Sequence, residues 1–142
     1  MIQSSNKILV PIDFSEQSLV ALEQSYNIAR EYQAEITLLH VIEESGMLVK
    51  FFSKQQHEEV KKDVQKELDK LALDVEKKSK IVVNTLVAKG SIYEKVAEVA
   101  ELINATMIVM GTNGDDFKKK RFIGSNALRV VRESSVPVIT IK

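Results

Sequence analysis

Five short segments rich in aliphatic and β-branched residues recur along the chain, separated by longer stretches with helical spacing of apolar residues. Two of these segments contain the runs 8–10 and 107–110, which are continuously apolar. Continuous runs are typical of strands that are covered on both faces in a parallel sheet, so helices must supply the cover. The predicted strands are 7–12, 35–42, 81–87, 105–111 and 136–142.

The stretches between these strands carry apolar residues at steps of three and four, the pattern of amphipathic helices. Ser15 followed by Glu16 predicts the start of the first helix, and Ser91 with Glu94 has the spacing of a capping box at the start of the third. The fourth helix is expected to begin near Ser125. A coiled coil is an alternative for the second helix, but its stripe spans barely two heptads, which favours packing against the sheet. The residues expected to face the sheet are Leu19, Leu22, Tyr26 and Ala29, then Val60, Val64, Leu68, Leu71 and Val75, then Val96, Val99, Ala100 and Ile103.

Strict alternation of strands and helices predicts an α/β fold with right-handed crossovers and an open parallel sheet in three layers. The 142 residues contain no Pro/Gly/Ser-rich break, so we expect a single domain over 1–142. Ligands of such sheets bind outside the carboxyl ends of the strands, where the winding reverses. This rule selects Asp13, Val41, Gly90 and Gly111 as candidate positions.

Composition excludes several classes of function. Lys plus Arg and Asp plus Glu each number 20, so the overall charge favours neither nucleic acid nor anionic lipid as a partner. There is no cysteine, which excludes disulfide and thiolate chemistry, and His40 and His57 are too few and too separated for a metal site. The N-terminus lacks the apolar core of a signal peptide, and no run approaches the roughly 18 apolar residues of a membrane span. We therefore expect a cytoplasmic protein with no membrane partner.

The stretch GTNGDDFKKKRFIGSN, residues 111–126, suits an anion. Gly111 ends a strand where a ligand could approach the backbone, and Asn113-Gly114 accepts the positive φ of a turn. Gly124, Ser125 and Asn126 precede a helix, so their N–H groups would be donors at the positive end of the helix dipole. The stretch is neither a Walker loop nor a Rossmann fingerprint. From the residues alone, an anion site and an ordinary strand end, turn and helix cap both remain open.

The glycine spacing, Gly-x2-Gly-x9-Gly-Ser, resembles the nucleotide signature of the universal stress protein family. The likeness extends along the whole chain, through KILVPIDFSEQS at 7–18, LLHV at 38–41, KGSIYEKV at 89–96 and SVPVITIK at 135–142. Resemblance to the ATP-binding branch of that family implies a Rossmann-like sheet of the adenine nucleotide alpha hydrolase type, with strand order 3-2-1-4-5. It also implies ATP, or ADP or AMP in its place, bound at the switch point, and homodimers joined through the final strand, 136–142.

Carried over position by position, the resemblance implies a set of nucleotide-binding residues. The Asp13 carboxylate would face the ribose hydroxyls or a Mg²⁺ ion near the phosphates, Val41 would contact adenine, and Gly90 would let the third segment pass near the base. Asn113 stands where many relatives have a histidine, which keeps the turn but changes what the side chain can donate. The full set is Ile12, Asp13, Val41, Gly90, Met110, Gly111, Gly114, Gly124, Ser125 and Asn126.

Three functions are compatible with these residues. The favoured one is a homodimeric ATP-binding stress-response regulator that acts on an unknown downstream protein and does not require catalysis. The second is a weak ATPase or self-phosphorylating enzyme that uses Asp13 with Mg²⁺ and Ser125, so the question of enzymatic activity stays open. The third is a nucleotide-free dimeric scaffold, against which the intact glycine spacing argues.

Four other features receive simpler interpretations. The basic run 118–121 is partly offset by Asp115 and Asp116 and lacks an aromatic platform, so we expect no nucleic-acid partner. His40 lies in a predicted strand and is expected to be a hydrogen-bonded structural residue. Phe51 and Phe52 are expected to be buried under the second helix. The alternating segment 136–142 is a predicted edge strand, and pairing with a second copy would give a two-fold dimer.

Overall fold

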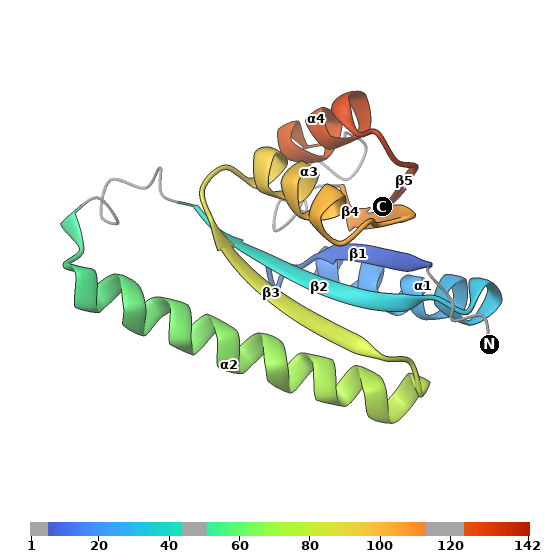
Figure 1. Ribbon diagram of the computed structural model, residues 1–142, viewed down its shortest axis with the longest axis horizontal. Coiled ribbons are helices and arrows are strands. Elements are labelled where there is room, and N and C mark those ends of the chain that lie inside the picture. The colour runs from blue at the N-terminus through green and yellow to red at the C-terminus, as the bar shows by residue number, and fades with distance from the viewer. Residues whose placement is uncertain (1–5, 44–50, 113–123) are drawn as a thin grey trace.

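The computed structural model describes residues 6–43, 51–112 and 124–142. These residues form a five-stranded sheet with helices against both faces, so the predicted three-layer α/β fold is confirmed (Figure 1). The strand order is β3-β2-β1-β4-β5, and all neighbouring strands are parallel. In chain order the elements are β1 (Lys7–Pro11), α1 (Glu16–Tyr32), β2 (Glu35–Ile42), α2 (Lys54–Ser79), β3 (Val83–Lys89), α3 (Ile92–Leu102), β4 (Met107–Gly111), α4 (Ser125–Glu133) and β5 (Val138–Ile141).

β1 lies at the centre of the sheet, where both faces are covered. Ile8 and Val10 belong to the core on one face and Leu9 to the core on the other, and all three side chains are 0% exposed. The two cores explain why residues 8–10 are apolar at consecutive positions rather than at alternate ones. The prediction for β2 has the observed bounds, whereas β3 is shifted by two residues toward the C-terminus.

α1 and α2 cover one face of the sheet, and α3 and α4 cover the other. This arrangement brings the starts of α1, α3 and α4 to the edge of the sheet at which the strands end. The first core joins β1 to Ala21, Leu22, Ala29, Leu68 and Val75 of α1 and α2, and the second joins β1 and β2 to Val96, Val99, Ala100, Ala127 and Val130 of α3 and α4.

The face that α1 turns toward the sheet agrees with the prediction at Leu22 and Ala29 and differs from it at Leu19. Leu19 was expected to be buried but is 39% exposed, and Tyr26 is only partly buried. Two adjacent rows of residues along α1 both repeat with the helical period. The row that packs on the sheet is rich in small side chains, which allow the helix to approach the sheet closely. Its members are Gln17, Ser18, Ala21, Leu22, Ser25 and Ala29.

α2 is 26 residues long, and only its C-terminal part packs on the sheet. Leu68 and Val75 are buried as predicted, and Leu71 between them is partly buried and packs against the same core. Val60 and Val64 are only partly buried because the helix begins beyond the end of the strands (Figure 1). For the same reason the burial expected for Phe51 is wrong, since Phe51 is 84% exposed. Within the described ranges, no helix has the length and apolar content to cross a membrane.

Of the two helix caps predicted from the sequence, one is observed and the other is not. Ser15 caps α1 as predicted, because its Oγ accepts the N–H of Ser18 at 3.1 Å. The capping box predicted at Ser91 and Glu94 is wrong, since the Ser91 side chain makes no cap hydrogen bond. Glu94 instead accepts a hydrogen bond from the Tyr93 hydroxyl. The reciprocal box of this structure is at the start of α2, where Ser53 and Gln56 bond each other's backbone N–H groups at 3.1 and 2.7 Å.

Candidate functional site

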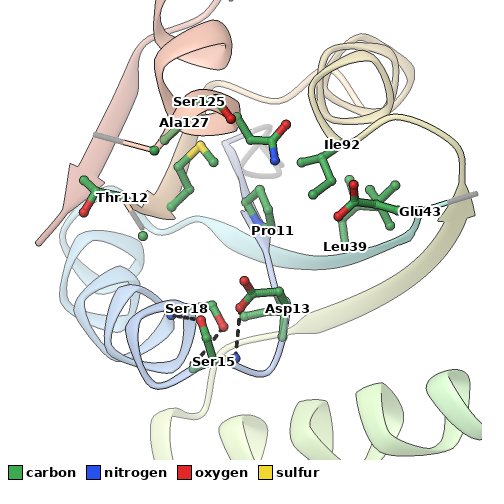
Figure 2. A pocket seen from close by; sticks show the side chains of 16 residues that line it. Pro11, Asp13, Ser15, Ser18, Leu39, Glu43, Ile92, Thr112, Ser125 and Ala127 are labelled. Atoms are coloured by element: carbon green, nitrogen blue, oxygen red, sulfur yellow. Dashed lines mark hydrogen bonds between the residues drawn. The ribbon is translucent and has the colours of Figure 1, made fainter. Parts of the chain in front are cut away.

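A cavity of about 340 Å³ lies where β1, β2 and β4 end, at the point where the winding of the sheet reverses (Figure 2). Strand ends supply one part of its lining, and the starts of α1, α3 and α4 supply the rest. The volume falls in the range of about 300–1,000 Å³ that is usual for small-molecule sites. The lining residues are Pro11, Ile12, Asp13, Ser15, Ser18, Leu39, Val41, Glu43, Ile92, Met110, Gly111, Thr112, Gly124, Ser125, Asn126 and Ala127.

The chain leaves β1 through a tight turn that places Asp13 at the cavity. The N–H of Ile12 donates to the Leu39 carbonyl at 2.7 Å, which extends the pairing of β1 with β2 up to this turn. One Asp13 carboxylate oxygen, Oδ1, accepts the N–H of Ser15 at 2.9 Å. Between them Phe14 has a φ of 62°, in the left-handed region. The turn therefore connects a buried strand to the capped start of α1 within three residues.

His40 supports this turn from the neighbouring strand β2. Its Nδ1 lies 2.7 Å from the Ile12 carbonyl oxygen, and because a carbonyl only accepts, Nδ1 carries the hydrogen and donates it. Its imidazole ring lies against the Phe14 ring, with the two centroids 5.2 Å apart. The expectation of a hydrogen-bonded structural histidine is confirmed.

At the end of β4, Gly111 allows α1 to approach the sheet. A β carbon at this position would lie 3.1 Å from the backbone carbon and oxygen of Gln17. The next residue, Thr112, is 3% exposed, and its carbonyl accepts the N–H of Gly124 at 2.7 Å. That hydrogen bond ties the start of α4 to the end of β4, so both elements present their ends to the same cavity.

α4 begins at the cavity without a side-chain cap. Its N-cap residue is Gly124, which has no side chain to accept a hydrogen bond, and its first turn contains no acidic residue. The N–H groups of Ser125, Asn126 and Ala127 therefore have no hydrogen-bond partner in the part of the chain that the structure describes. Among the described residues, these three donors and the positive end of the helix dipole lie at the cavity without a partner, which is an arrangement suited to an anion.

The other side of the cavity combines aliphatic side chains with the carboxylate of Glu43. Figure 2 shows Ile92, Leu39 and Glu43 on one side, with Ser125 and Thr112 on the other. Val41 at the end of β2 adds a partly buried apolar side chain to the lining. A ligand with a flat apolar part and an anionic part matches this division.

Comparisons with known proteins identify the family. The model of the universal stress protein family matches residues 5–142. The chain belongs to the universal stress protein family. Among its relatives, MJ0531 of Methanocaldococcus jannaschii is 31% identical, over 96% of this chain and 81% of the relative. YxiE of Bacillus subtilis is 29% identical, over 96% of this chain and 99% of the relative.

Solved structures of universal stress proteins show the same fold. The structure of MJ0577 of Methanocaldococcus jannaschii has a TM-score of 0.84 at 26% identity and covers 99% of this chain and 97% of that one. A universal stress protein in complex with cAMP has a TM-score of 0.73 at 19% identity and covers 96% of this chain and 97% of that one. One from Archaeoglobus fulgidus in complex with dAMP has a TM-score of 0.69 at 18% identity and covers 99% of this chain and 100% of that one.

In this universal stress protein, most of the residues selected from sequence come together at the cavity. Gly114 and Asn113 lie outside the described residues. Gly90 does not line the cavity; it follows the last residue of β3, has a φ of 136° and donates its N–H to the Ile42 carbonyl at 2.9 Å. The selected residues that line the cavity are Ile12, Asp13, Val41, Met110, Gly111, Gly124, Ser125 and Asn126.

Sequence reasoning missed several lining residues. Thr112 and Glu43 follow directly on the ends of β4 and β2, so the rule of the strand ends, applied one residue further, would have found them. Ser15 was recognised as a helix cap but not as part of the site. Ile92 had no signal in the sequence, because its position depends on where α3 packs.

The described residues do not form a metal site by themselves. No group of three or more His, Asp or Glu side chains in the described ranges is arranged to hold a metal ion. Asp13 and Glu43 are the acidic residues in the described lining, and one Asp13 oxygen is already engaged by Ser15. Because Mg²⁺ requires about six oxygen ligands, Asp13 fits this ion only if phosphates and water supply the others.

Proposed function

We propose that this protein binds an adenine nucleotide in the cavity, with ATP as the main ligand and ADP or AMP as alternatives. The observation that carries the proposal is the uncapped start of α4, whose free N–H groups face the cavity beside the end of β4. Phosphate oxygens would accept those hydrogen bonds without a dedicated lysine. Gly114, which the structure does not describe, stays in the proposed phosphate cradle on the glycine spacing alone.

The side of the cavity with the aliphatic side chains is the proposed place of the base. Leu39, Val41 and Ile92 offer aliphatic contacts there. Met110, elsewhere in the lining, adds a polarisable thioether. The complexes of related universal stress proteins with cAMP and dAMP support adenine as the base. The nucleotide would therefore lie across the ends of β1 and β4 with its phosphates at α4.

Asp13 is the proposed partner of the ribose hydroxyls or of a Mg²⁺ ion that the nucleotide brings. Its carboxylate lies on the cavity between the base side and α1 (Figure 2). A bound Mg²⁺ would neutralise phosphate charge next to the two acidic side chains of the lining, Asp13 and Glu43. Without such neutralisation, those carboxylates would oppose a free polyphosphate.

We further propose that the protein acts as a cytoplasmic homodimeric regulator in the stress response, with a downstream protein partner. Binding without turnover is favoured because the described lining contains no histidine or lysine to activate the Ser125 hydroxyl or a water molecule, and His40 donates to a backbone carbonyl and is not part of the lining. The dimer would form through β5, an edge strand with an exposed Ile139.

The direct test removes one backbone donor from the start of α4. Ser125→Pro deletes the N–H and the hydroxyl, and proline suits both the first position of a helix and the conformation of Gly124, with φ −62° and ψ 159°. Ser125→Ala deletes the hydroxyl alone. Lys54→Pro makes the same change at the first position of α2, which does not line the cavity.

We expect MgATP to bind the wild-type protein and to raise its free energy of unfolding by about 2.7 kcal/mol at ~100 times the dissociation constant. Ser125→Pro should weaken MgATP binding about tenfold relative to Ser125→Ala, because one charge-assisted hydrogen bond is lost. Lys54→Pro should bind as the wild type does. Titration calorimetry measures these constants, and equal affinities of the two Ser125 variants would exclude the start of α4 as the phosphate site.

A further inference from the structure

Phe14 has an unfavourable backbone conformation between two residues of the cavity. Asp13 and Ser15 both line the cavity, whereas the Phe14 side chain does not. Its φ of 62° lies in the left-handed region, which side chains with a β carbon rarely adopt. Such a conformation persists only where the surrounding contacts enforce it, and it tends to occur at functional sites.

His40 contacts this turn at two points. The Phe14 and His40 rings lie with their centroids 5.2 Å apart, inclined at 35°. Nδ1 of the same imidazole donates to the Ile12 carbonyl at 2.7 Å. One side chain of β2 therefore holds the chain on both sides of Asp13, at the backbone of Ile12 and at the ring of Phe14.

The consequence is a fixed direction for the Asp13 carboxylate. The left-handed turn brings the Ser15 N–H to 2.9 Å from Asp13 Oδ1, and this hydrogen bond leaves the second oxygen directed at the open cavity (Figure 2). We propose that Phe14 is a positioning residue of the nucleotide site, which with His40 holds the Asp13 carboxylate ready for the ribose hydroxyls or the nucleotide-bound Mg²⁺. The inference rests on the proposed function. A group held in its bound direction before the ligand arrives loses less entropy on binding.

A purely structural role for Phe14 predicts a different result. The Phe14 ring also borders a groove between α1 and α2, together with Leu19, Leu71 and Leu73. If the ring only stabilised that groove, its loss would lower stability, and any effect on nucleotide binding would not depend on Asp13. The two roles are separated by asking whether the effect of Phe14 needs the Asp13 carboxylate.

The experiment is a double-mutant cycle on the full chain, with MgATP as the probe and dissociation constants from titration calorimetry. The variants are Phe14→Ala, Asp13→Ala and the double variant. Phe14→Tyr keeps the ring, and Phe14→Gly removes it while accepting the positive φ without strain. Phe51→Ala is the matched control, since it truncates a phenylalanine that is 84% exposed and does not line the cavity.

We expect Phe14→Ala and Asp13→Ala each to weaken MgATP binding about tenfold, and the double variant to be no weaker than about tenfold. Phe14→Tyr should bind as the wild type does, Phe14→Gly should fall between the wild type and Phe14→Ala, and Phe51→Ala should have no effect. If Phe14→Ala lowers the melting temperature, Phe14→Gly replaces it in the double-mutant cycle, alone and in combination with Asp13→Ala.

Two results would overturn the inference, and they are distinguishable. A double variant about a hundredfold weaker than the wild type would mean that Phe14 and Asp13 act independently, which excludes positioning but leaves the nucleotide site intact. A wild-type protein that binds no adenine nucleotide would overturn the proposed function, and the inference with it.

Discussion

At the scale of a single residue, both the fold and the site depend on Gly111 having no β carbon. A β carbon there would lie 3.1 Å from the Gln17 backbone, so the absence of a side chain lets α1 pack against the end of β4. The sequence suggested that Gly111 gives a ligand access to the backbone. The structure adds a packing requirement, because the neighbour that a side chain would meet is α1.

We predict that Gly111→Ala destabilises the protein by about 1–3 kcal/mol, because the added methyl group must displace the backbone of α1. The same displacement moves Ser15 and Ser18, which line the cavity, so the affinity for MgATP should fall as well. Urea unfolding measures the first effect and titration calorimetry the second. Unchanged stability would show that α1 yields without cost and that the packing argument is wrong.

At the scale of helices and strands, the sequence predicted the order of the elements better than their contacts. The continuous apolar run of β1 and the cap at Ser15 depend on local sequence, and both predictions are confirmed. The prediction for the inward face of α1 was partly wrong, because two adjacent rows of residues fit the helical period. Only the short packing distance between α1 and β4 selects the row with small residues. Ile92 joined the cavity without any local signal, for the same reason.

The N-caps of α2 and α3 have similar sequences but different hydrogen bonds, so their contributions to stability can be compared. Both helices start with a serine at the N-cap and a Glu or Gln three residues later, but only Ser53 accepts a hydrogen bond with its side chain. We predict that Ser53→Ala lowers the free energy of unfolding by about 1 kcal/mol. Ser91→Ala should cost less, because no cap hydrogen bond is lost. Urea denaturation compares the two variants, and an equal or larger loss for Ser91→Ala would contradict the assignment.

At the scale of the whole molecule, the two edges of the sheet are not equivalent. β3 forms one edge, and α2 packs against it, with Gln65 and Asp69 bonded to the Thr85 hydroxyl. β5 forms the other edge, and in the described part of the chain each edge strand pairs with one neighbour, β3 with β2 and β5 with β4. β5 carries an exposed apolar side chain, Ile139, and an open edge of this kind is a surface for a partner, which is the basis of the proposed homodimer.

If the proposed dimer forms through β5, we predict that Ile139→Lys yields a monomer, since it would place a charge in the middle of the paired strands. Val82→Lys is the control, because Val82 is an exposed apolar residue just before β3, at the other edge. Light scattering after size exclusion should give twice 16.0 kDa for the wild type and for Val82→Lys, and 16.0 kDa for Ile139→Lys. A wild-type protein that elutes as a monomer would refute the proposed interface.

A crystal structure of the protein with MgATP would show whether the start of α4 binds the phosphates of an adenine nucleotide where the winding of the sheet reverses. We expect phosphate oxygens within hydrogen-bond distance of the backbone N–H groups of Ser125 and Asn126, with the base against Val41 and Ile92. A nucleotide bound elsewhere on the protein, or a cavity still empty at saturating MgATP, would contradict this expectation.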